Sequence, residues 1–239
     1  MKQLRRIKPG WYVLLALLIY SIIITLSWQR SQKKLNQLSE GQITTSGEVI
    51  RPRTDGLWMP IAGAKIPSSA AYLPNAARTY RQGRSQGFDF YDGDAGIPIS
   101  YGTAVIAADD GVLERIDHSY EELSPEAWDS LLAQVAQGAT EEQLDKLRGR
   151  QVWVKNFEGV TLRYAHLSAV REGLSVNSRI FRGQVLGYVG NSGTDNGVKN
   201  NQNGARLHFE IFYPDGSYFG QDLDAENVRI KAAGLFVGP

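Results

Sequence analysis

The stretch NGARLHFEI, residues 203–211, is the part of the sequence from which the fold of this chain can be worked out. Its alternation places Arg206, His208 and Glu210 on one face of an extended strand, and the apolar residues between them on the other face. A histidine on such a polar face could be a metal ligand, a catalytic base, or neither. The chemistry therefore depends on which residues elsewhere in the chain stand beside His208.

The composition of the chain limits that chemistry. The 239 residues are 42% hydrophobic and 21% charged, which is typical of one globular domain with an accessory segment. A net charge of +1 gives no overall attraction to nucleic acid, and we expect none as a partner. The absence of cysteine excludes disulfides, thiolate nucleophiles and cysteine-ligated metal sites. A zinc site would have to combine carboxylates with His118, His166 and His208.

The N-terminus predicts a membrane anchor. A basic segment, residues 1–10, precedes the uncharged run WYVLLALLIYSIIITLSW, residues 11–28, which begins and ends with tryptophan. As a helix this run is roughly 27 Å long, enough to cross a thin bilayer. A cleaved signal peptide is the alternative, but no small-x-small cleavage site follows the run. We expect a single-pass anchor in the cell (inner) membrane, with residues 1–10 cytoplasmic and the C-terminal domain extracytoplasmic.

The rest of the chain predicts a mainly β domain. Residues 29–56 form a polar spacer, and from residue 57 onward short apolar runs alternate with glycine, proline and asparagine. The predicted strands are residues 87–91, 104–117, 150–156, 160–167, 184–190 and 207–213. Their spacing predicts an antiparallel sheet or a partly open barrel ending near residue 223, with residues 224–239 as a C-terminal tail.

A helical hairpin is predicted to interrupt the strands at residues 121–149. Ser124 suits an N-cap, Pro125 the first helical position, and the apolar residues that follow recur at helical spacing. Thr140 and Gln143 form the pattern of a capping box for a second helix. The apolar face of this insert either packs on the sheet of its own domain, which we favour, or provides a surface for a partner.

Three stretches carry a family resemblance. TYRQGRSQGFDF (residues 79–90), LRYAHLS (162–168) and GARLHFEI (204–211) stand in this order, among the glycine-rich segments PIAGA, GTAVIAADDGVL and RGQVLGYVGNSGT. Together they resemble the LytM-domain, or lysostaphin-type, zinc endopeptidases that cut peptidoglycan cross-bridges. The resemblance covers residues 57–223, apart from the inserted hairpin. It implies a barrel-sandwich hybrid of the duplicated hybrid motif type.

The resemblance also implies roles for individual residues. In that family a first motif H-x-x-x-D and the second histidine of a later H-x-H motif hold zinc, while two other histidines assist catalysis. Asp89 and His208 match ligand positions, and His166 matches a catalytic histidine. Ser85 stands where the first ligand histidine belongs, and Arg206 stands at the first histidine of H-x-H.

These two replacements predict a site without catalysis. Catalytic zinc usually has three protein ligands, and the matched positions supply only Asp89 and His208. Arg206 cannot act as a base at neutral pH and would repel a divalent cation. Loss of acid–base assistance alone costs about 10²–10⁴ in rate. We expect no zinc cofactor, although His166 could turn inward as a third ligand. We also expect Arg206 to replace the charge of the ion by pairing with Asp89.

The resemblance therefore implies a pseudoenzyme at the cell wall. The expected partners are peptidoglycan peptides, or a wall hydrolase or envelope protein that the domain regulates during morphogenesis. The alternatives are an active zinc endopeptidase with an unusual ligand set and a structural component of an envelope complex. Arg81, Arg84 and Arg206 are expected near one mouth of the groove, where they would bind peptide carboxylates. His118 is expected to be a surface histidine, and the role of Glu210 stays open.

Overall fold

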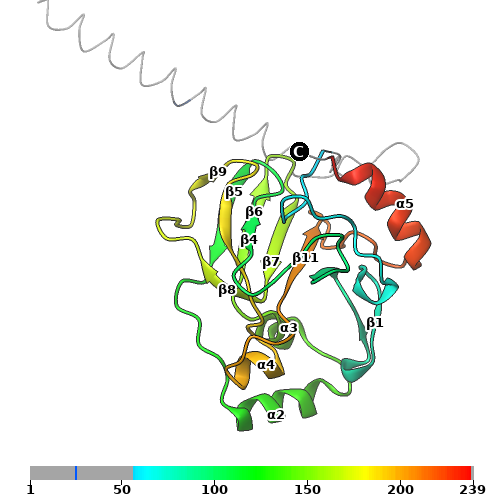
Figure 1. Ribbon diagram of the computed structural model, residues 1–239, viewed down its shortest axis with the longest axis vertical. Helices are drawn as coiled ribbons and strands as arrows, with labels where there is room; N and C mark the ends of the chain where they lie inside the picture. Colours follow the sequence, from blue (N-terminus) through cyan, green and yellow to red (C-terminus); the bar gives the residue numbers. More distant parts are fainter. Residues whose placement is uncertain (1–24, 26–55, 238–239) are drawn as a thin grey trace, which may run out of the picture. The chain divides into compact units, whose positions relative to one another are not determined.

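The computed structural model describes Thr25 and residues 56–237 (Figure 1). The chain divides into two compact units, Met1–Ile50 and Arg51–Pro239. The predicted anchor and spacer lie outside the described residues, except for Thr25 and Gly56. Within the described part of the chain, no helix has both the length and the apolar character needed to cross a membrane.

The described part of the second unit is built mainly of antiparallel strands, which confirms the predicted class. A six-stranded sheet has the order β3 (Gly87–Tyr91), β11 (Arg206–Phe212), β7 (Thr161–Ala165), β6 (Val152–Asn156), β5 (Gly111–Ile116), β9 (Arg179–Ile180). A three-stranded sheet has the order β4 (Ala104–Ile106), β10 (Val185–Val189), β8 (Leu167–Val170), and β1 (Ala77–Arg78) pairs with β2 (Gly83–Arg84). The predicted strand 104–117 is thus two strands in different sheets, because the chain bends at Asp109 between them.

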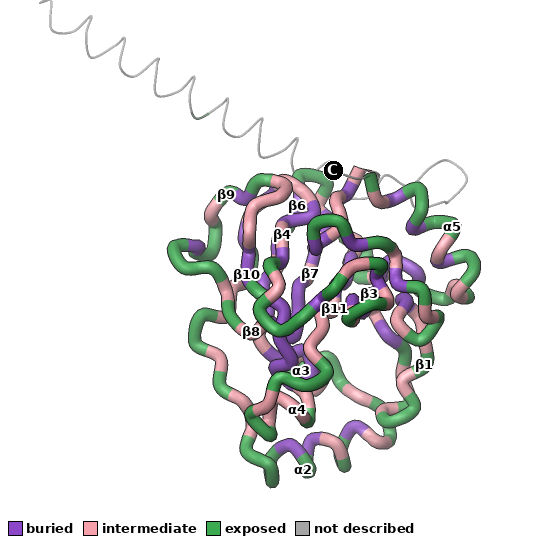
Figure 2. The backbone as a smooth tube through the Cα atoms, viewed as in Figure 1, coloured by how far each residue is buried: buried purple, intermediate pink, exposed green. Residues whose placement is uncertain are grey.

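The period-2 pattern of β11 separates core from site as predicted. Leu207, Phe209 and Ile211 are buried in the main hydrophobic core, which also takes residues from both larger sheets. Burying one such side chain contributes about 1.5–3 kcal/mol. Figure 2 shows the buried segments concentrated along these strands. The opposite face of β11 is therefore available to carry polar side chains.

The expected C-terminal tail is instead part of the domain. Helix α5 (Ala225–Leu235) begins after Asp224, whose side chain accepts a hydrogen bond from the backbone N–H of Asn227. Three residues of this helix, Val228, Ala232 and Leu235, join the main core. The boundary expected at residue 223 is corrected accordingly, because the core continues through α5.

The inserted hairpin forms as predicted but packs differently. Its helices are α2 (Pro125–Val135), capped by Ser124, and α3 (Glu141–Arg148), capped by the predicted box. Its buried apolar residues form a cluster separate from the main core: Trp128, Leu131, Val135, Leu144 and Leu147. The favoured packing on the sheet is therefore wrong. The hairpin lies beside the short helix α4 (Asp195–Val198) at one end of the sheets (Figure 1).

Candidate functional site

Strand register brings the three sequence-predicted histidine and aspartate positions together. β3 and β11 pair so that Asp89 lies opposite His208, and β11 and β7 pair so that His208 lies opposite Ala165. The next residue, His166, adopts a positive φ of 59° between β7 and β8. Its backbone N–H donates to the carbonyl of Arg148 at 2.8 Å. Non-glycine residues rarely adopt this conformation, and such positions cluster at functional sites.

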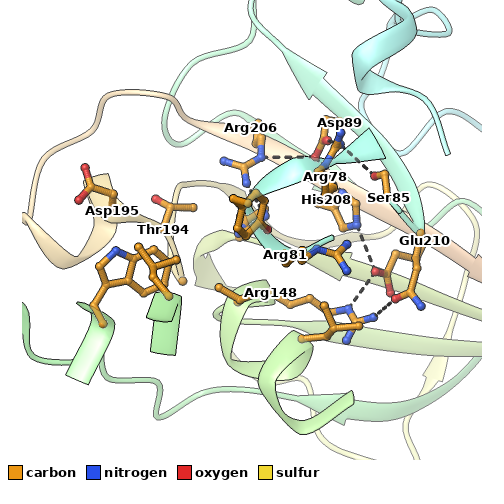
Figure 3. Close-up of a pocket in the computed structure, with 18 residues that line it drawn as sticks. Arg78, Arg81, Ser85, Asp89, Arg148, Thr194, Asp195, Arg206, His208 and Glu210 are labelled. Carbon is orange, nitrogen blue, oxygen red and sulfur yellow. Dashed lines mark hydrogen bonds and ion pairs between the residues drawn. The ribbon is translucent and has the colours of Figure 1, made fainter. Parts of the chain in front are cut away.

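Asp89 is held by two arginines and a histidine (Figure 3). Its Oδ2 accepts a hydrogen bond from Nη2 of Arg78 at 2.6 Å, and its Oδ1 lies 2.8 Å from Nδ1 of His208. Nε of Arg206 lies 3.4 Å from Oδ1, an ion-pair distance without hydrogen-bond geometry. The expected pairing of Arg206 with Asp89 is present, but Arg78 is the closer partner. Arg78 also donates to the buried Oγ of Ser85 at 3.0 Å.

His208 lies between two carboxylates. Its second ring nitrogen, Nε2, is 3.1 Å from Oε1 of Glu210. Burial lowers the pKa of His208, but Asp89 and Glu210 outweigh that effect and raise it. Burial raises the pKa of Asp89, yet His208, Arg206 and Arg78 hold it well below its usual range. His208 is therefore an imidazolium that donates one hydrogen bond to each carboxylate.

Glu210 connects this network to the hairpin. Its Oε1 accepts from Nε of Arg148, the last residue of α3, at 2.8 Å, and Oε2 lies 3.6 Å from Nη1 of Arg163. Burial raises the pKa of Glu210, but Arg148 and His208 lower it to about 2. Nη2 of Arg148 also donates to the side chain of Gln86. The buried carboxylate thus joins β11, β7 and the inserted hairpin.

His166 is neutral and fully engaged. Its Nδ1 is 2.7 Å from the carbonyl oxygen of Ser192, so Nδ1 carries the proton and donates it. Nε2 then accepts a hydrogen bond from Nη2 of Arg206 at 2.8 Å. Burial lowers the pKa of His166 well below its ordinary value, and the nearby charges of Arg206 and His208 lower it further. The alternative in which His166 becomes a third metal ligand is not the arrangement observed.

The residues present do not fit a catalytic zinc ion. Zinc requires deprotonated ligands with free lone pairs, usually three from the protein. Both nitrogens of His208 donate to carboxylates, and both oxygens of Asp89 contact cations. Among the described residues, no three histidine, aspartate or glutamate side chains are grouped to hold a metal ion.

A cavity of about 350 Å³ covers this network. Polar residues line it on the sheet side, including Arg78, Asp89, His166, Arg206, His208 and Glu210. The helical hairpin supplies an apolar wall of Trp128, Leu132, Leu144 and Leu147. The insert therefore forms part of the site.

The predicted arginine cluster is divided. Arg81 and Arg206 both line the cavity, but Arg84 does not. Arg84 is exposed, donates to the carbonyl of Asn75 at 3.2 Å, and lines a different depression. His118 is an exposed residue whose Nε2 lies 2.8 Å from the carbonyl oxygen of Leu174.

Sequence reasoning missed Arg78 and Arg148 and left Glu210 undecided. The alternation of β11 already places Glu210 beside His208, and Arg163 lies opposite Glu210 in the register of β7 and β11. Those two positions carried a usable signal. Arg78 and Arg148 lie outside the three motifs, and only the tertiary fold brings them to the site.

A family comparison identifies the domain type. The model described as Peptidase family M23 matches residues 132–221, which contain His166, Arg206 and His208. These residues of the chain belong to a peptidase M23 domain of the LytM type. This confirms the resemblance inferred from the motifs. The match begins after Ser85 and Asp89. The strand register places Asp89 opposite His208, and the hydrogen bond from Arg78 places Ser85 beside Asp89.

Several solved structures match part of this chain at low sequence identity. Csd3 of Helicobacter pylori is 18% identical, with 82% of this chain and 41% of that chain covered and a TM-score of 0.40. A zinc-containing peptidase from Vibrio cholerae is 17% identical, covering 75% and 41%, with a TM-score of 0.44. The catalytic domain of lysostaphin from Staphylococcus simulans is 18% identical, covering 60% and 77%, with a TM-score of 0.36. The chain thus spans about two fifths of the first two proteins. No curated protein matches its sequence.

Proposed function

We propose that this M23 domain is a non-catalytic module of the cell wall that binds peptidoglycan peptides in its former substrate groove. In this proposal residues 11–28 anchor it in the cell membrane, with the domain on the extracytoplasmic side. Its sheets form the barrel-sandwich hybrid of the family. The bound peptides position the domain beside wall hydrolases or other envelope proteins, which it regulates.

One observation carries the proposal. The guanidinium of Arg78 lies on Asp89 at 2.6 Å, and both nitrogens of His208 are engaged by carboxylates. A metallopeptidase uses its zinc ion to generate the attacking hydroxide and to polarise the substrate carbonyl. A network that fills the ligand positions with cations removes both contributions. The cavity above the network is kept, which supports binding without hydrolysis.

Zinc titration tests the loss of metal. We expect the full chain, purified without chelator, to contain less than stoichiometric zinc and to bind none at micromolar concentration. The expectation follows because zinc would have to displace Arg78 and deprotonate His208. Stoichiometric zinc that disappears in His208→Ala but not in His118→Ala would overturn the proposal and favour an active endopeptidase.

Sedimentation with purified peptidoglycan tests the binding. We expect the full chain in detergent to sediment with wall sacculi and to leave their cross-links intact over hours. Failure to sediment in a folded, zinc-free sample would contradict peptide binding. The structural role in an envelope complex would then be the better explanation.

A further inference from the structure

We propose that the cavity under the hairpin is a pocket for the free carboxylate at the C-terminus of a peptide. Arg206 and Arg81 bind the carboxylate, and the apolar wall of α2 and α3 holds the terminal side chain. The inference rests on the proposed function and makes it more specific. It names a chain end as the ligand, in place of the middle of a cross-bridge.

Buried charge is the first observation. Four cations line the floor of the cavity: Arg78, Arg148, Arg206 and His208. Only two buried carboxylates, Asp89 and Glu210, lie among them. Glu141 approaches Arg148 at 3.6 Å with 68% of its side chain exposed, and Asp195 is paired with Lys199. Since uncompensated buried charge is costly, the floor favours an anionic ligand.

Unused hydrogen-bond donors are the second observation. Nε of Arg81, Nε of Arg206 and Nε1 of Trp128 are buried without a hydrogen-bond partner within the described residues. Trp128 itself is only 6% exposed and lines the cavity. All three groups are donors, whereas the one unpartnered acceptor on a described lining residue, Oε2 of Glu210, lies 3.6 Å from Nη1 of Arg163. The donors therefore require a ligand that accepts hydrogen bonds. A carboxylate offers two oxygens in the geometry that a guanidinium binds best.

The other cationic side chains of the cavity are already committed. Arg78 donates to Ala71, Ala77, Ser85 and Asp89. Arg148 is divided between Glu210, Gln86 and Glu141. Arg81, by contrast, donates only to the carbonyl of Arg84, and Nη1 of Arg206 makes no hydrogen bond within the described part of the chain. Arg81 and Arg206 are therefore the two cations with capacity for a ligand.

The hairpin favours the entry of a peptide terminus into the cavity over the passage of a continuous peptide. On one side of the cavity Nε2 of Gln82 donates to the carbonyl of Ala136 at 3.0 Å. On the other side the backbone N–H of Gly193 donates to Glu122 at 3.1 Å, and Gly149 packs so closely on Ser192 that no side chain fits there. The insert is thus attached at both flanks of the cavity. We infer that these attachments hinder the passage of a continuous peptide and favour the entry of a chain end.

The terminal side chain has a complementary surface. Leu132, Leu144 and Leu147 face the cavity beside Trp128, across from the charged floor. A ligand with a carboxylate at one end and a small apolar group beside it satisfies both walls at once. A cavity of about 350 Å³ suits a dipeptide of small residues.

The test compares acetyl-Ala-Ala as the free acid with its carboxamide, each in the L,L and D,D forms, by calorimetric titration of the full chain. We expect one form of the acid to bind at least about tenfold more tightly than its amide. We expect Arg206→Gln and Arg81→Gln each to weaken the acid by about tenfold or more and to leave the amide unchanged. Arg84→Gln is the matched control, because Arg84 lies on the neighbouring surface outside the cavity. If Arg206→Gln fails to fold, Arg81→Gln carries the comparison alone.

Equal binding of acid and amide, or binding of neither at about 10 mM, would overturn the inference. So would an unchanged affinity in both arginine variants. Sacculus sedimentation and zinc content are measured on the same preparation to separate the two proposals. Sedimentation without discrimination between acid and amide rejects only the terminal-carboxylate pocket. Tighter binding of the acid than of the amide, in a sample that holds stoichiometric zinc, rejects only the proposal that the domain functions without zinc.

Discussion

Replacing Asp89 with alanine is expected to lower the free energy of unfolding by about 3–5 kcal/mol. The carboxylate is 8% exposed and is the shared partner of Arg78, His208 and Arg206. Removing it leaves three largely buried cations close together, with side chains 12–19% exposed. The loss therefore includes the cost of unpaired buried charge, which exceeds the value of an exposed ion pair.

Thermal unfolding of the domain measures this effect. A loss of this size corresponds to a decrease of roughly 6–20 °C in Tm for a domain of this length. Glu142→Ala is the matched control, because Glu142 is 81% exposed and pairs only with Lys146 on the same helix. That control is expected to change stability by less than about 0.5 kcal/mol. If Asp89→Ala behaved like the control, the buried network would not be a stabilising replacement for a metal.

The sequence was sufficient to predict those site positions that depend on the alternation of residues within one strand. Alternation along residues 203–211 predicted which face of β11 carries His208, and the family resemblance placed Asp89 and His166 beside it. The position of Arg78 could not be derived in this way. It is the last residue of the two-residue strand β1, directly before the short helix η2 (Thr79–Arg81), and its side chain reaches Asp89 in β3.

The helices show the same limit. Capping residues predicted both helices of the insert, since Ser124 and Thr140 act on the nearest backbone N–H groups. Helical periodicity shows that a face is buried but does not identify its partner, and the hairpin packs on itself. Helix α5 was missed although the sequence carried its signals: Asp224 provided a cap, and Val228, Ala232 and Leu235 stand at the i, i+4, i+7 spacing of a helix face.

Rebuilding the metal site gives the second large expected effect. Ser85→His and Arg206→His restore the two family positions that this chain has changed. We expect these two changes alone to give only weak zinc binding, because Arg78 still lies on Asp89 and fills the space next to Ser85. Ser85 is 1% exposed, so an imidazole there has no room while Arg78 remains. Adding Arg78→Ala removes the competing cation and frees volume for the new ligand.

The triple variant (Ser85→His, Arg206→His and Arg78→Ala) is therefore expected to bind zinc about 100-fold more tightly than the double variant without Arg78→Ala. This is a difference of roughly 2.7 kcal/mol. Competition titration against a zinc-binding dye measures the zinc dissociation constants of both variants. Adding Asp89→Ala to the triple variant should abolish the gain in affinity. Arg84→Ala in place of Arg78→Ala is the matched control, because it removes a guanidinium outside the cavity. Equal zinc affinity with and without Arg78 would show that the missing histidines alone account for the lost metal. A gain that depends on Arg78→Ala would show that this arginine occupies the position of the ion, since among the described residues it is the guanidinium of Arg78 that bonds Oδ2 of Asp89.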